Sequence, residues 1–169
     1  MKLTTLIATA GIAILSGCAI AQTNSPDRLN DLEIAHVAYT ADNIDIRYAH
    51  LALALSDNPA IHKFAATMIR DHTAVNEQAL ALLGKLKAQP QDNFLSRQLV
   101  VNSKALVEEM SKLQGAAFDR RYAENELAYH RAVNDLVANA FIPNIENGEV
   151  KTLFAADSKS SRCTSSTRQ

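Results

Sequence analysis

The stretch GAAFDRRYAENELAYHRAVNDLV, residues 115–137, decides the fold of this chain of 169 residues. Its apolar and aromatic side chains recur every three to four positions, which is the period of one face of an α-helix. That face is formed by Phe118, Tyr122, Val133 and Val137. Between them the same face passes through Glu126 and His130. The stretch therefore predicts a long amphipathic helix whose buried side carries a carboxylate and an imidazole.

Two helices of the same period are expected at the start of the domain. The first begins at Asn30, where Glu33 completes a capping box, and ends before Ser56. Pro59 fits the first turn of a second helix, which runs as far as Ala88. The connection between the two is only about three residues long, which makes them antiparallel neighbours.

The rest of the domain is also expected to be helical. A third helix lies between Pro90 and Gly115, and the helix of the opening stretch ends at Pro143. Residues 147–154 begin another helix, and no segment alternates as a strand does. The sequence therefore predicts an all-α, antiparallel four-helix bundle over residues 31–154, with an incomplete last helix.

Charge and cysteine content exclude several classes of function. The formal net charge is −1, which gives no electrostatic reason to bind nucleic acid. Cys18 and Cys163 both lie outside the predicted helical domain. The domain therefore has neither a disulfide framework nor a cysteine-based metal site.

The N-terminus is typical of an export signal. Lys2 precedes an apolar run over residues 6–15, which is too short to cross a membrane as a permanent helix. Residues 1–22 are therefore expected to be a signal peptide. Residues 23–30 are polar and contain a proline, and they are expected to form a tether.

Two cleavage sites are compatible with this signal. Leu-Ser-Gly-Cys at residues 15–18 resembles the lipobox of bacterial lipoproteins, in which Cys18 would carry the lipid. Ala-Ile-Ala at residues 19–21 fits ordinary signal peptidase. With Ala19 after the cysteine, a lipoprotein would be sorted to the outer membrane. Both interpretations predict a periplasmic protein, and the first anchors it to the outer membrane.

Two other predicted helices also place a titratable side chain on the apolar face. Asp45 occupies such a position on the first helix and His72 on the second. Metal sites in helical bundles are built in this way, from carboxylates and imidazoles of facing helices. We therefore expect a metal site with His72, His130 and Glu126 as ligands and Asp45 as a fourth. Zinc, copper or iron would suit these mixed donors.

Two other interpretations of these residues stay open. A buried histidine paired with a carboxylate is an ordinary core feature, and Glu126 and His130 can pair within one helix. Acid–base catalysis on an organic substrate is the third interpretation. Ferritin-like di-iron sites use Glu-x-x-His, whereas Glu126 and His130 are four apart and Ile69 stands three residues before His72. Residues beside the apolar faces are expected to support the ligands: Asp71, Asp119 and Tyr122.

Three segments carry a family resemblance: MIRDHTAVN (68–76), GAAFDRRY (115–122) and NELAYHRAVN (125–134). They resemble a bacterial family of exported proteins of unknown function, often described as outer-membrane proteins, with a ferritin-like helical fold. The resemblance covers residues 30–154 and implies a ferritin-like periplasmic bundle, with metal handling by analogy of fold. It implies no particular reaction. The recurrent polar positions of the family correspond to Asp45 (more often Glu), Asp71, His72, Asp119, Glu126 and His130.

The chain departs from the family after residue 154. Family members continue with an amphipathic helix of the form HEQHA, whereas this chain continues with AADSKSSRCTSSTRQ. With one choice of codons, a second reading frame over this tail encodes LEIFQVHEQHA. We therefore expect residues 155–169 to be a non-native, disordered tail that arose by a frameshift, with loss of the last helix.

These observations favour an exported envelope protein of unknown role, without enzymatic activity and with an incomplete His/carboxylate metal site. The alternative is a non-catalytic helical interaction module tethered to the outer membrane, which binds a protein partner or a second copy of itself. A di-iron oxidase would need more carboxylates on the apolar faces than the sequence provides.

Overall fold

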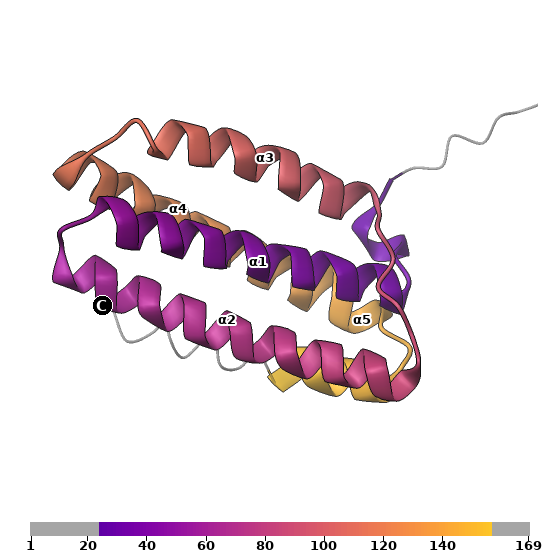
Figure 1. The fold of residues 1–169 in the computed structure, drawn as a ribbon. Coiled ribbons are helices and arrows are strands. Elements are labelled where there is room, and N and C mark those ends of the chain that lie inside the picture. Colours follow the sequence, from indigo (N-terminus) through magenta and orange to yellow (C-terminus); the bar gives the residue numbers. More distant parts are fainter. Residues whose placement is uncertain (1–23, 157–169) are drawn as a thin grey trace, which may run out of the picture.

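The computed structural model describes residues 24–156, and every regular element in this range is helical. A short 3-10 turn, Pro26–Arg28, precedes the main helices. These are α1 (Asp31–Leu55), α2 (Pro59–Leu86), α3 (Phe94–Met110) and α4 (Gly115–Leu136), shown in Figure 1. A π-helical turn (Val137–Phe141), α5 (Ile142–Asn144) and a helix over residues 148–156 follow. The predicted all-α fold, with an additional helix beginning after the fourth, is confirmed.

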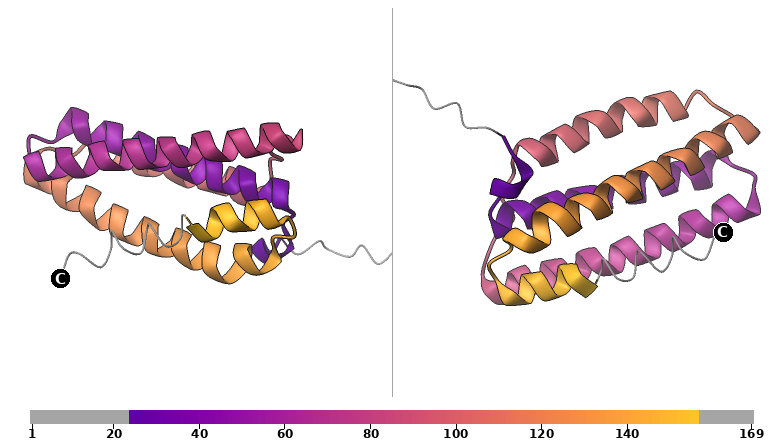
Figure 2. Two further views of the ribbon diagram at one scale, coloured as in Figure 1. Left: turned by 90° about the horizontal axis from the view of Figure 1, so that it is seen from below. Right: turned by 180° about the vertical axis from the view of Figure 1, so that it is seen from behind.

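The helices form two layers. Helix α1 lies between α2 and α3, and these three make one layer (Figure 1). Helix α4 packs behind α1 in a second layer, together with the helix over residues 148–156 (Figure 2). Helix α1 contacts α2, α3 and α4 and is therefore the central helix of the bundle. No helix within residues 24–156 is long and apolar enough to cross a membrane.

The ends of the helices follow from local side chains. The Asn30 side chain accepts hydrogen bonds from the backbone N–H groups of Leu32 and Glu33, and the Glu33 carboxylate accepts one from Asn30 N–H. This capping box satisfies N–H groups that have no partner inside the helix. Helix α2 begins with Pro59 and ends at Lys87, whose φ of 51° closes the last turn in the left-handed region.

Two apolar clusters fill the bundle, one toward each end. One cluster contains Ile44, Tyr48, Ala49, Ala52, Ala65, Met68, Met110, Phe118 and Tyr122. The other contains Leu29, Ile34, Val37, Val137, Phe141, Ile145, Val150 and Phe154. On α1, Asp45 lies between Val37 of the second cluster and Tyr48 of the first. On α4, Glu126 and His130 lie between Tyr122 of the first cluster and Val137 of the second. These polar side chains form a layer between the two clusters, which we call the polar layer.

The expected tether is partly folded onto the domain. Leu29 is only 7% exposed and belongs to the second apolar cluster, because the 3-10 turn before it directs its side chain inward. The expected signal peptide and the Cys18 lipidation site lie outside the described residues. The folded part therefore begins several residues before the expected boundary at residue 31.

The last described helix is anchored to the start of the first. The Asp31 carboxylate accepts hydrogen bonds from the backbone N–H groups of Glu146 (3.0 Å) and Asn147 (2.7 Å). Val150 and Phe154 then bury their side chains in the second apolar cluster. The helix continues to residue 156, two residues beyond the expected end of the domain. The rest of the expected tail, residues 157–169, lies outside the described residues.

Candidate metal centre

The polar layer brings together side chains from three helices. Asp45 of α1 is completely buried, whereas the side chains of His72 on α2 and His130 on α4 are 20% and 28% exposed. Asp45 Oδ2 lies 2.6 Å from His72 Nε2 and 3.3 Å from His130 Nε2. One ligand atom from each residue can be chosen so that all three lie within 4.8 Å of one another. Three of the four expected ligands therefore converge.

Each histidine uses its other ring nitrogen elsewhere. His72 Nδ1 lies 2.7 Å from Asp42 Oδ1, and His130 Nδ1 lies 2.9 Å from the Glu126 carbonyl oxygen of its own helix. Carboxylate and carbonyl oxygens only accept, so each Nδ1 carries the proton and donates. In the neutral tautomer, Nε2 of both rings then has a free lone pair on the side of Asp45.

Four buried oxygens of the polar layer, on Asp45, Glu126 and Tyr122, have no hydrogen bond of regular geometry. Both Asp45 oxygens are buried and make no hydrogen bond of regular geometry, although Oδ2 lies 2.6 Å from His72 Nε2 and the Asp45 carboxylate also interacts with the Glu126 carboxyl. Glu126 Oε2 and the Tyr122 hydroxyl are buried without a partner as well. Burying carboxylate oxygens away from water is costly unless a cation or a proton compensates the charge.

Burial and mutual contacts shift the titration of these groups. Burial alone would raise the pKa of the Asp45 carboxyl, but His72 and His130 together hold it below its usual value. Burial would lower the pKa of His72, but its contacts with Asp42 and Asp45 raise it to about 10. Burial and the adjacent Asp45 charge raise the pKa of Glu126. In the metal-free protein, the positive charge of the protonated His72 imidazole thus compensates the negative charge of the Asp45 carboxylate.

The geometry suits a tetrahedral metal ion. Metal–ligand bonds of roughly 2.0–2.2 Å place tetrahedral ligand atoms about 3.3–3.6 Å apart. The His130–Asp45 separation of 3.3 Å already matches this spacing, whereas the His72–Asp45 separation of 2.6 Å would have to widen. Two imidazole nitrogens and one carboxylate oxygen are donors that zinc, copper and iron accept.

Comparison with known proteins places the chain in a family. The family model described as a domain of unknown function, DUF4142, matches residues 18–160. The chain belongs to the DUF4142 family. Comparison with curated proteins finds no match.

A solved structure shares the fold of this DUF4142 domain. It comes from a Streptomyces coelicolor protein described as secreted and labelled DUF305, with a TM-score of 0.67 and 11% sequence identity. The similarity covers 79% of this chain and 86% of the other. At this level of identity the similarity shows the fold alone, and it supports the all-α bundle.

The remaining expected site residues of the DUF4142 domain lie in different surroundings. Glu126 interacts with the Asp45 carboxylate, but its Oε2 is 3.8 Å from Nδ1 of His130, the nitrogen that does not face Asp45. Asp71 is half exposed and pairs with Arg70 at the surface. Asp119 accepts a hydrogen bond of 2.6 Å from the Ser56 hydroxyl. Asp71 and Asp119 thus have other partners within the described part of the chain.

Two residues next to the ligands complete the layer. Tyr122, which was expected beside the ligands, is completely buried, and burial and the charges of Glu126 and Asp45 raise its pKa. Asp42, which contacts His72, was not predicted from the sequence. It precedes Asp45 by three residues, so the two side chains share one face of α1. That spacing was the signal that could have identified Asp42.

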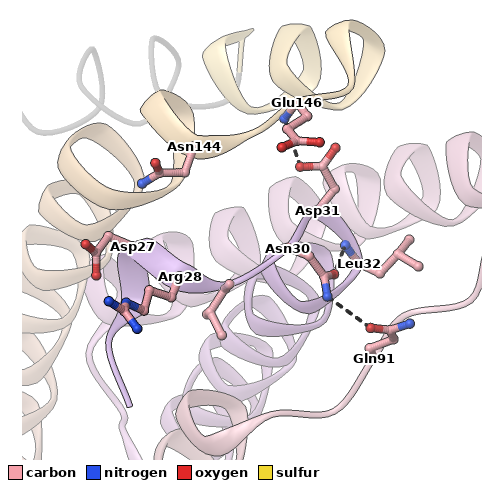
Figure 3. Close-up of a pocket in the computed structure, with 9 residues that line it drawn as sticks. Asp27, Arg28, Asn30, Asp31, Leu32, Gln91, Asn144 and Glu146 are labelled. Atoms are coloured by element: carbon pink, nitrogen blue, oxygen red, sulfur yellow. Dashed lines mark hydrogen bonds between the residues drawn. The ribbon is translucent and has the colours of Figure 1, made fainter. Parts of the chain in front are cut away.

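An open pocket elsewhere on the domain is less suited to a ligand. It lies at the start of α1, and Figure 3 shows its lining, which includes Asp27, Asn144 and Glu146. Its polar groups already serve the fold: Asn30 donates to Gln91 (3.2 Å), and Asp31 accepts from the backbone N–H groups of Glu146 and Asn147. We therefore regard the polar layer as the candidate functional site.

Proposed function

We propose that this DUF4142 domain is an exported, non-enzymatic protein that binds one transition-metal ion in its polar layer. His72 Nε2, His130 Nε2 and Asp45 Oδ2 would be the ligands. The observation that carries this proposal is the convergence of two imidazole Nε2 atoms on the completely buried Asp45 carboxylate. A metal ion at this point would replace the proton of His72 Nε2 as the positive charge that compensates the buried Asp45 carboxylate.

Glu126 has a different place in this proposal. Its carboxylate is buried and close to His130, and the sequence predicts it as a ligand. Its position beside Nδ1 fits a residue that orients His130 and adds negative charge near the ion. Its carboxyl also interacts with Asp45, so a small rotation of the side chain would make it a fourth ligand.

The decisive experiment is metal binding by the full mature chain. The metal-free protein is titrated with Zn²⁺, Cu²⁺ and Fe²⁺ in a calorimeter, alongside the variants His72→Ala and His50→Ala. His50 is an exposed histidine of α1 and serves as a matched control. We expect one ion per chain, loss of tight binding in His72→Ala and full retention in His50→Ala. Unchanged affinity in His72→Ala would rule out the site.

The proposal includes the cellular location. Export is supported by the signal-like residues 1–22, and lipid anchoring to the outer membrane by the lipobox that ends at Cys18. Cell fractionation of the wild-type chain and Cys18→Ser tests the anchor. The wild-type chain should sediment with the membranes, and the variant should be soluble in the periplasm. Equal distribution of the two would favour ordinary signal cleavage.

An interaction module is the second candidate. Leu80 on α2 and Leu127 on α4 expose 47% and 51% of their surfaces, which could contribute to a protein interface. Single exposed apolar residues are common on protein surfaces, so this observation is weaker than the convergence of the metal ligands. A melting temperature that does not respond to metal, together with saturable binding of a protein partner, would favour this candidate.

A further inference from the structure

We propose that the bound metal ion keeps a coordination position open to the outside and takes a small external donor, an anion or an imidazole, as an additional ligand. This inference rests on the metal-binding function proposed above. It adds that the site is built for ligand exchange and not only for structural stabilisation. Structural zinc sites have four protein ligands, whereas sites that act on other molecules keep a position free.

The three ligands surround the ion from one side only. Asp45 is completely buried and forms the floor of the site, whereas His72 and His130 are partly exposed at its rim. The two rings stand side by side, with centroids 5.8 Å apart and planes inclined by 40°. An ion held between their Nε2 atoms and Asp45 therefore has its remaining positions on the exposed side of the rings.

No fourth protein ligand is in place among residues 24–156. The group of mutually close ligand atoms contains one atom each from Asp45, His72 and His130 and none from another residue. Glu126 faces the other nitrogen of His130, at 3.8 Å from Nδ1. Asp42 is engaged by Nδ1 of His72. Asp42 thus lies behind the His72 ring, and Glu126 is buried beside His130 and Asp45, away from the exposed edges of the rings.

The described part of the second layer covers only part of α2. Glu149 of the last described helix pairs with Lys85 near the end of α2, and Ala156 lies beside Gln78 in one shallow depression. Gln78 is six residues beyond His72 along α2, which corresponds to roughly 9 Å of helix. Within the described residues, this helix therefore contacts α2 about two turns away from His72, and the His72 and His130 side chains are 20% and 28% exposed.

The test uses the Cu²⁺-loaded mature chain, with azide and imidazole as probes. Each probe is titrated while absorption and electron paramagnetic resonance spectra are recorded. We expect a saturable change that fits one added ligand per copper ion. We also expect the rate of copper removal to increase with chelator concentration, because the chelator can enter the open position before the protein ligands leave. The control variant His50→Ala retains His72 and His130 and should respond to both probes as the wild type does.

A second variant tests whether Glu126 closes the site. Glu126→Gln preserves the shape of the side chain and removes its charge. Equal responses of wild type and Glu126→Gln to azide would support an open position. A response in the variant alone would overturn the inference, because Glu126 would then be the fourth ligand in the wild type. A copper protein that ignores both probes would overturn it too, and failure to bind copper at all would remove the proposed function itself.

Discussion

Asp42 Oδ1 lies 2.7 Å from Nδ1 of His72, on the opposite edge of the ring from the Nε2 atom that contacts Asp45. This arrangement, in which a carboxylate holds one ring nitrogen and the other faces a potential metal ion, is typical of histidine ligands in metalloproteins. Both partners are largely shielded from solvent, with 20% of the His72 and 14% of the Asp42 side chain exposed. Asp42 therefore fixes both the tautomer and the orientation of His72.

The first prediction concerns this pair. Asp42→Ala should weaken metal binding by about 10–100-fold, the usual cost of removing such a supporting group. Asp42→Asn should recover part of the loss, because its amide oxygen can still accept from Nδ1–H. Calorimetric titration of the two variants measures the effect. Asp71→Ala removes a surface carboxylate that pairs with Arg70, and its affinity should equal that of the wild type. Equal affinity in Asp42→Ala would show that Asp42 does not support the site.

The second prediction concerns stability with and without metal. An ion that binds only the folded chain stabilises it by about 2.7 kcal/mol when its free concentration is a hundredfold above the Kd. The melting temperature should therefore rise with metal concentration and return to its original value after chelation. Circular dichroism melting of wild type, His130→Ala and His50→Ala checks this. The rise should be absent in His130→Ala, and a rise of full size in that variant would place the metal elsewhere.

The sequence predicted three residues of the polar layer, because each is a potential metal ligand at a position where the helical period predicts a buried apolar side chain. Asp45, His72 and His130 each interrupt an otherwise apolar face, and facing helices bring such positions together. Asp42 was missed although it shares a helix face with Asp45, because such spacing is also common among solvated charges and its contact with His72, thirty residues later, is visible only in the structure. The helical period also could not show which nitrogen of His130 faces the Glu126 side chain. The orientation of the ring depends on the contact between its Nδ1 and the backbone carbonyl of Glu126.

The packing of single residues outside the helical pattern could not be predicted. Residues 23–30 have the polar composition of a tether, yet Leu29 belongs to the core. One apolar residue in a polar segment has no period of its own, so only the neighbouring helices show where it packs. The position of the last described helix likewise depends on hydrogen bonds from Glu146 and Asn147 to Asp31, at the other end of the chain.

The third prediction concerns the cost of the polar layer in the metal-free protein. Tyr122 is completely buried, and its hydroxyl makes no hydrogen bond. A buried hydroxyl without a partner costs about 1–3 kcal/mol, so Tyr122→Phe should leave the free energy of unfolding unchanged or raise it. Chemical denaturation of the metal-free protein measures this, with Tyr129→Phe as the control. The Tyr129 hydroxyl donates to the Ala41 carbonyl at 2.9 Å, so its removal should destabilise the protein by about 1 kcal/mol. A clear loss of stability in Tyr122→Phe would mean that its hydroxyl has a partner in solution.

The fourth prediction separates stability from metal binding at Glu126. Its Oε2 atom is buried without a hydrogen bond, and burial raises its pKa. Glu126→Met, which is apolar and of similar volume, should therefore leave the metal-free protein as stable as the wild type or more stable. The same variant should bind metal more weakly, because it removes a carboxylate beside His130. Denaturation and calorimetry on one preparation measure both effects. A destabilised variant with unchanged metal affinity would instead assign Glu126 a purely structural role in the core.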